Sequence, residues 1–144
     1  MKLLFIVAVV ELVSVSAFAQ SAQVCPALPP NTNLEWQYRE GPDFDLCYAH
    51  EHESVDTAFG IYFGWAPSFT PKKESEIGPG RIGGREVTWY RTESSSLGRE
   101  ALVTFNSSSA EVAHVWVLAS SQQQLGARLS ILEHIAFKPQ SNAH

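Results

Sequence analysis

The chain lacks the local signatures of most catalytic sites. It contains only two cysteines, and charged residues make up just 17% of its 144 positions. No Cys-x-x-Cys pair, P-loop or Gly-x-Ser-x-Gly elbow occurs, so redox, phosphoryl-transfer and nucleophilic catalysis have no local support. The net charge of -5 argues against nucleic acid as a partner. No motif indicates a cofactor, and none is expected.

Length and composition indicate one folded domain. A chain of this length is too short for two independent cores, and a 44% apolar share is too high for disorder. All four Trp, all four Tyr and six of the eight Phe lie after residue 19. The core of the domain should therefore rely on a few large rings.

Residues 1–19 have the pattern of a cleaved signal peptide, with an apolar run at 3–15 and an A-x-A pattern at 17–19. A retained anchor is the alternative, but the run is shorter than the roughly 20 residues that a span needs, and it contains Glu11. A lipoprotein is a third option, although the small residue expected before a lipidated Cys25 is missing. We therefore expect an exported chain, periplasmic or secreted, with no membrane span after cleavage.

Export gives the two cysteines a structural role. An oxidising compartment favours pairing, so Cys25 and Cys47 are expected to form a disulfide. The alternative, a reactive thiol, lacks a basic neighbour that would lower a thiol pKa. Residues 20–33 are rich in proline and are interpreted as an extended arm outside the core, residues 34–138 as the single globular domain and 139–144 as a tail.

Alternation of apolar and polar residues predicts strands along most of the mature chain. Gly60 and Gly64 share one strand face and leave space there for an aromatic neighbour, or mark a bulge. The last strand is apolar on nearly both faces, which is typical of a central position. The predicted strands cover residues 34–38, 44–48, 59–65, 85–91, 101–105 and 113–119.

The periodicity becomes helical near the C-terminus. Ser121 followed by Gln124 resembles a capping box, and Pro139 should end a helix of about 16 residues. The apolar positions at helical spacing are Leu125, Leu129, Leu132 and Ala136.

The elements together predict an α+β fold, in which a single, mostly antiparallel sheet of five or six strands is packed by one C-terminal amphipathic helix. This order, strands followed by a C-terminal helix in an exported protein, is similar to that of the photosystem extrinsic-protein superfamily. The resemblance covers most of the mature chain and concerns element order alone, so it implies no activity or site residue.

The histidines form the local cluster that is best suited to metal binding or catalysis. His50 and His52 are two apart, so on a strand they would project to one side and could share a metal, with His114 as the third ligand. The spacing does not match the H-E-x-x-H motif of a zinc protease helix. The alternative interpretation is a solvated acidic turn.

A long glycine-rich connection, residues 66–84, carries a second candidate site. Residues 78–83 match the letters of G-x-G-x-x-G but lack the strand before and the helix after that dinucleotide binding requires. The cations of this segment could form an anion or aromatic ligand site on an acidic protein, unless the segment is only a solvated loop. The cations concerned are Lys72, Lys73, Arg81 and, just after the segment, Arg85, and the aromatic residue just before the segment is Trp65.

Two functions from different classes follow. The first is an exported, non-enzymatic binding or assembly-accessory domain for a protein or a small-molecule ligand. The second is a small metal-dependent or hydrolytic enzyme that uses His50, His52 and His114. The distances between the three imidazoles distinguish the two functions, because the ligands of a metal site must converge on one point.

Overall fold

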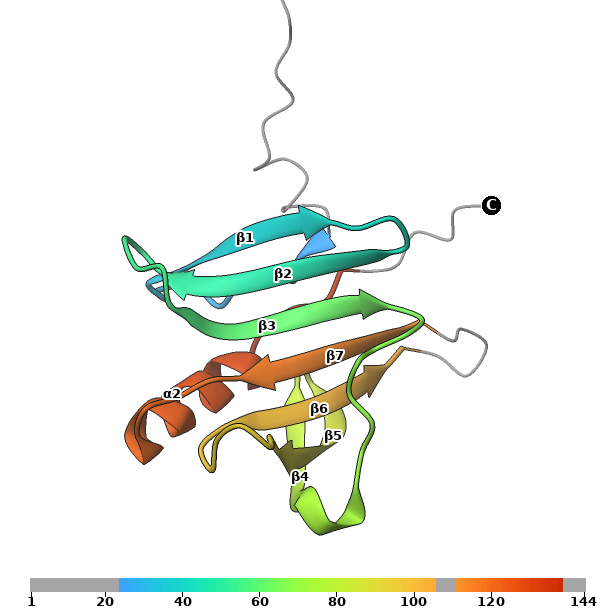
Figure 1. Ribbon diagram of the computed structural model, residues 1–144. Coiled ribbons are helices and arrows are strands. Elements are labelled where there is room, and N and C mark those ends of the chain that lie inside the picture. Colours follow the sequence, from blue (N-terminus) through green and yellow to red (C-terminus); the bar gives the residue numbers. More distant parts are fainter. Residues whose placement is uncertain (1–23, 106–110, 139–144) are drawn as a thin grey trace, which may run out of the picture.

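The structure is a computed structural model that describes residues 24–105 and 111–138. It is an α+β fold in which one antiparallel sheet is packed by a C-terminal helix (Figure 1). The predicted signal peptide at 1–19, the first residues of the predicted arm and the predicted tail at 139–144 lie outside the described residues. The elements are β1 (Leu34–Glu40), β2 (Phe44–Glu51), β3 (Thr57–Gly64), the 3-10 helix η1 (Lys73–Ser75), β4 (Glu76–Ile82), β5 (Arg85–Arg91), β6 (Arg99–Thr104), β7 (Val112–Val117) and α2 (Gln122–Glu133).

Two meanders make up the sheet. The spatial order is β1-β2-β3-β7-β6-β5-β4, and every neighbouring pair is antiparallel. Strands β1 to β3 follow one another, as do β4 to β7, and the two meanders join where β3 pairs with β7 (Figure 1). Strand β7 is thus the middle strand, which confirms the position expected from its two apolar faces.

The sheet has seven strands rather than the five or six that we expected. The extra strand is β4, in the segment interpreted as a loop. Its sequence contains Gly78, Pro79 and Gly80, residues that normally interrupt strands, and its pairing with β5 is irregular between Glu76 and Gly78. An edge strand tolerates proline, because one side of its backbone has no partner strand.

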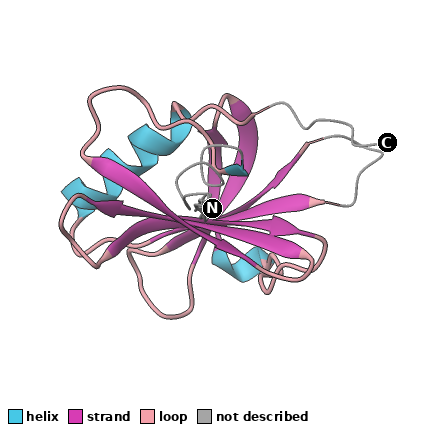
Figure 2. Ribbon diagram, turned by 90° about the horizontal axis from the view of Figure 1, so that it is seen from above, coloured by secondary structure: helices cyan, strands magenta, loops and turns pink. Residues whose placement is uncertain are grey.

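A crossover segment, residues 65–75, leads from β3 to β4 at the far edge of the sheet. It passes across the face opposite α2, and Figure 2 shows α2 and η1 on opposite sides of the sheet. Ring contacts fix its course, because Phe69 packs on His114 of β7 and Tyr90 of β5. The segment therefore covers only part of that face.

The core lies between the sheet and α2. Alternate residues of the strands point toward the helix and are buried, and the fully buried ones include Phe59, Ile61, Val103, Val115 and Val117. Leu125 and Leu132 of α2, seven residues apart on one side of the helix, are buried against them. The side of the sheet that α2 packs is called the covered face, and the opposite side the open face.

The C-terminal helix begins as predicted and ends earlier. The Ser121 side chain accepts a hydrogen bond from the Gln124 amide, which confirms the cap. The helix has 12 residues and ends at Glu133. Two backbone hydrogen bonds between Ala27 and Ala136 hold the following residues in an extended form, so a tertiary contact ends the helix before Pro139 could do so.

Cys25 and Cys47 form the predicted disulfide, with their Cα atoms 5.8 Å apart. The described part of the arm does not lie outside the core as expected. Cys25 is 1% exposed, and Pro26 is also buried and accepts a hydrogen bond from the Trp36 indole. In residues 24–105 and 111–138, no helix has the length and apolar character needed to cross a membrane.

Candidate functional site

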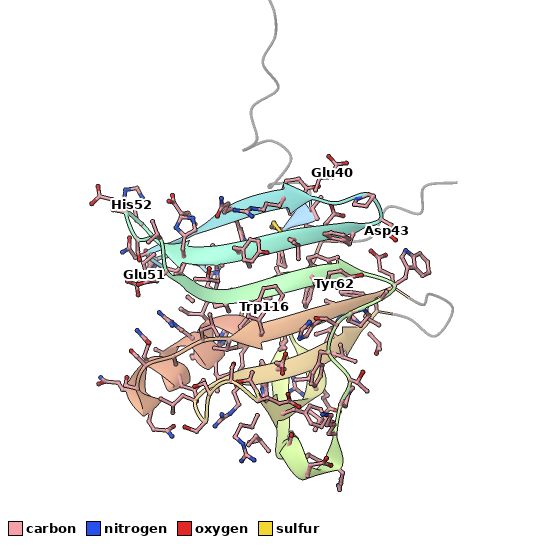
Figure 3. All side chains as sticks on the ribbon, in the orientation of Figure 1. Glu40, Asp43, Glu51, His52, Tyr62 and Trp116 are labelled. Carbon is pink, nitrogen blue, oxygen red and sulfur yellow. A yellow bond between two sulfur atoms is a disulfide. The ribbon has the colours of Figure 1, made fainter. Side chains whose placement is uncertain are left out.

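Aromatic side chains line the open face of the sheet. The Trp116 ring lies across Gly60, the residue opposite it on β3, because a Cβ at Gly60 would be 2.0 Å from the ring. The Tyr48 ring approaches the Trp116 ring edge-on at 5.9 Å between centroids. Figure 3 shows Trp116 and Tyr62 on this face of β7 and β3. The space left by glycine in β3 is filled by an aromatic neighbour, as the sequence suggested.

His114 lies beside Trp116 under the crossover segment. The Phe69 ring stacks on the imidazole with 5.2 Å between centroids and 15° between planes. The His114 Nε2 atom is 3.2 Å from a carboxylate oxygen of Glu100 on β6. The histidine is 6% exposed, whereas the Glu100 side chain is 22% exposed. Glu100 therefore extends from a buried partner toward solvent.

Burial sets the protonation of this histidine. Desolvation lowers the pKa of His114 below its ordinary value, and the charge and hydrogen bond of Glu100 oppose the shift without reversing it. The imidazole is therefore neutral at pH 7, and its Nε2–H donates to the carboxylate. The exposed end of this pair on the open face is the Glu100 carboxylate.

A cleft of about 560 Å³ lies between the crossover segment and the open face. Its aromatic walls are Phe69 and Trp116, and hydroxyl groups come from Ser68, Thr70, Ser75, Thr92 and Ser94. Its charged residues are Lys72, Arg91, Glu93 and Glu100, which sum to zero, and Lys72 donates to Glu93 at 2.8 Å. We call this site the crossover cleft.

The structure separates the predicted cations. Lys72 lines the crossover cleft, whereas Lys73 pairs with Glu76 at 2.7 Å on the surface. Arg81 is 3.7 Å from Glu86 and lines a second hollow of about 630 Å³ on the open face, together with Tyr90. The crossover segment contributes to both hollows, since Pro71 lines the second one and Phe69 and Lys72 line the crossover cleft.

Arg85 and Trp65 lie apart from both hollows. Arg85 packs over the Phe105 ring and donates to the Thr104 and Phe105 carbonyls. Strand alternation places it on the face of β5 opposite Glu86, and therefore opposite Arg81. The Trp65 side chain is 61% exposed at the end of β3 and lines neither hollow.

The three histidines do not converge. His50 and His52 are 3.8 Å and 3.4 Å from the same carboxylate group, that of Glu35 on β1. His114 lies two strands away from β2, roughly 10 Å across the sheet, and in register with Leu46, roughly 13 Å along the strand from His50. Among the described residues, no group of three or more His, Cys, Asp and Glu side chains could hold a metal ion.

Of the residues that line the crossover cleft, sequence reasoning named Lys72 as a ligand-binding candidate and missed Glu100 and Trp116. Phe69 lies in a segment without periodicity, and Glu100 sits in an ordinary polar position of a strand. The sequence did contain one signal for Trp116. Gly60 leaves space on its strand face, which indicated an aromatic neighbour there. That neighbour, Trp116, is one wall of the cleft.

No family model matches the chain, and neither a curated protein nor a solved structure matches it significantly. The element order that we expected is confirmed, while the likeness to the photosystem extrinsic-protein superfamily stays a prediction. The chemistry of the crossover cleft therefore carries the functional inference.

Proposed function

We propose that the chain is an exported, non-enzymatic binding domain that takes a small, neutral, polyhydroxylated ligand, such as a sugar, in the crossover cleft. One observation carries this proposal. The cleft combines two aromatic walls with five hydroxyl side chains and with charged groups that sum to zero.

Aromatic walls and polar groups fit the two kinds of surface on a sugar ring. The face of an aromatic ring is negative and attracts the polarised C–H groups on one side of a sugar. Trp116, spread flat over Gly60, offers such a face next to the cleft. The sugar hydroxyls can donate to Glu100 and accept from Lys72, both of which line the cleft.

Charge and size favour a small neutral ligand. A phosphate or carboxylate ligand would meet Glu93 and Glu100, and an ammonium ligand would meet Lys72. The volume of about 560 Å³ lies within the range typical of small-molecule sites, which is roughly 300–1,000 Å³. The cleft is therefore suited to one or two sugar rings.

Glu100 is held as a fixed hydrogen-bond acceptor. Its contact with buried His114 restrains one carboxylate oxygen, and Phe69 covers the histidine from the other side. A site with restrained polar groups loses less conformational entropy when a ligand binds. His114 acts here as a positioning residue, which requires no catalytic step.

Export is supported by the N-terminal signal pattern and by the disulfide between Cys25 and Cys47, which suits an oxidising compartment. A domain of this kind would meet sugars in the periplasm or outside the cell.

Nuclear magnetic resonance of the indole N–H groups tests the proposal, because the four tryptophans give four resolvable signals. The Trp116 signal is assigned by its loss in Trp116→Phe. Glucose, galactose, N-acetylglucosamine, maltose and cellobiose are added singly up to about 50 mM, which detects even millimolar binding. At least one sugar should shift the Trp116 signal saturably.

Three variants complete this experiment. Trp116→Ala and Glu100→Gln should weaken binding at least tenfold, whereas Trp65→Ala, outside the cleft, should leave the dissociation constant unchanged. The proposal is wrong if no sugar shifts the Trp116 signal, or if Trp65→Ala weakens binding as much as Trp116→Ala. Saturable binding of choline or sulfate in place of every sugar would also contradict it, because the ligand would then be charged.

A further inference from the structure

Within residues 24–105 and 111–138, strand β1 is an edge of the sheet, and one row of its backbone groups has no partner strand. In the described ranges its one neighbouring strand is β2 (Figure 1). The His52 amide donates to the Asn33 carbonyl at one end of the β1–β2 ladder, and the Gly41 amide donates to the Phe44 carbonyl at the other. Hydrogen bonds alternate along an antiparallel pair, so residues 35, 37 and 39 bond toward β2. The amide and carbonyl groups of residues 34, 36, 38 and 40 point outward.

We propose that this edge pairs with the β1 strand of a second copy of the chain. The two strands run antiparallel about a two-fold axis at Gln37, so the two sheets continue into one. This inference is independent of the sugar site.

The pairing about Gln37 is self-complementary in charge. It places Glu35 of each copy opposite Arg39 of the other, so the two-fold axis creates two opposite-charge pairs. Both residues lie on the open face, where Arg39 packs over Tyr48 and Glu35 approaches His50. Their positions are non-hydrogen-bonded in the new ladder, which brings their side chains closest together.

The backbone hydrogen bonds and the side chains on the covered face are also compatible with this register. Trp36 comes opposite Tyr38, and both have outward backbone groups, so each such pair exchanges two hydrogen bonds. Both aromatic side chains point to the covered face, where Trp36 donates to the Pro26 carbonyl and Tyr38 donates to Asp45. Aromatic cross-strand pairs add stability to antiparallel ladders.

Other registers lose these contacts. A slip by one residue sets outward-facing backbone groups against inward-facing ones, which breaks the ladder. A slip by two residues places either Glu35 or Arg39 opposite Gln37, so the charge pairs disappear.

The opposite edge of the sheet explains why pairing should stop at two copies. Strand β4 carries Pro79, has an irregular register between Glu76 and Gly78, and contains Gly78 at a φ of 149°. Proline and irregular backbone prevent edge-to-edge pairing. An assembly through β1 alone is closed by its two-fold axis.

Sedimentation velocity of the disulfide-bonded mature chain, from about 1 µM to about 1 mM, tests the proposal. The wild type should show a monomer–dimer equilibrium. Glu35→Arg and Arg39→Glu should each raise the dimer dissociation constant at least tenfold, because like charges then face each other. The double variant, Glu35→Arg with Arg39→Glu, should restore dimerisation, since each new arginine faces a new glutamate.

A mixture of the two single variants gives the sharpest result. Glu35→Arg and Arg39→Glu chains should dimerise with each other more tightly than either does alone, because only the mixed pair has opposite charges at both positions. Circular dichroism checks that each variant is folded. The proposal is overturned if the wild type stays monomeric at about 1 mM, if neither the double variant nor the mixture recovers the dimer, or if Arg81→Glu on β4 weakens the dimer equally.

Discussion

The indole of Trp116 lies directly over Gly60, its partner across the β3–β7 ladder. A Cβ atom at Gly60 would be 2.0 Å from Cζ2 and 2.3 Å from Cε2 of the ring. Neither strand can give way easily, because both lie in the middle of the sheet. The flat position of this ring therefore depends on the missing side chain of its neighbour.

Gly60→Ala should consequently displace the Trp116 ring. Overpacking of this kind costs about 1–3 kcal/mol of unfolding free energy, which urea denaturation measures. Gly126→Ala is the control, since an added Cβ meets nothing within 4 Å there and alanine favours the helix by about 0.5–1 kcal/mol. Equal stability of Gly60→Ala and the wild type would show that the ring does not occupy this position.

The unfolding free energy should fall as the pH drops below about 6.5. The pKa of His114 is lowered in the folded state, mainly by desolvation, so the unfolded chain takes up a proton first. This stability is complete above the unfolded pKa and is lost as the pH falls toward the folded pKa.

The variant His114→Gln should flatten this part of the pH profile, measured by urea denaturation at a series of pH values between 5 and about 8. Ser130→Ala, which changes an exposed side chain that does not titrate, serves as the control and should keep the wild-type slope. An unchanged slope in His114→Gln would assign the pH dependence to other groups.

Loss of the disulfide should destabilise the domain by about 3 kcal/mol, the chain-entropy value for a loop of this size. Cys25 and Cys47 are separated by 22 positions, and both side chains are buried. Reduced wild type and the double variant Cys25→Ala with Cys47→Ala should show similar losses in urea denaturation. A loss in the variant alone would indicate that the side-chain volume, rather than the cross-link, matters.

Ser121→Ala should cost about 0.5–2 kcal/mol, because the Gln124 amide at the start of α2 would lose its acceptor. Ser130→Ala, at an exposed position within the same helix, is the matched control and should change the stability by less than about 0.5 kcal/mol. Thermal unfolding followed by circular dichroism compares them. Equal melting temperatures for the two variants would contradict the capping role.

Periodicity predicted the elements whose side chains alternate or repeat regularly. The six expected strands occur, and Ser121 begins the helix, because these features depend on neighbours along the chain. Strand β4 was missed since Pro79 and two glycines resemble a loop until the edge position is known. The helix end was missed because it depends on Ala27, which is distant in sequence.

The candidate site was less predictable than the fold. His114 and Glu100 meet across the β6–β7 ladder, and Phe69 reaches them only because the crossover segment passes over this part of the sheet, a path that no local pattern encodes. His50 and His52 were correctly seen as neighbours, yet the residue they share is Glu35, opposite His50 on β1. Sequence spacing thus identified neighbours along one strand and missed contacts that are made across paired strands and by the crossover segment.

The strand order has a consequence for how the chain folds. Each meander contains only contacts between neighbouring strands, so each can form with little loss of loop entropy. The β3–β7 ladder joins residues that are far apart in sequence and must wait until the crossover segment has spanned the sheet. The topology therefore predicts that the two meanders form early and that the β3–β7 ladder forms late. Hydrogen exchange during refolding should accordingly protect the β7 amides that bond to β6 before those that bond to β3.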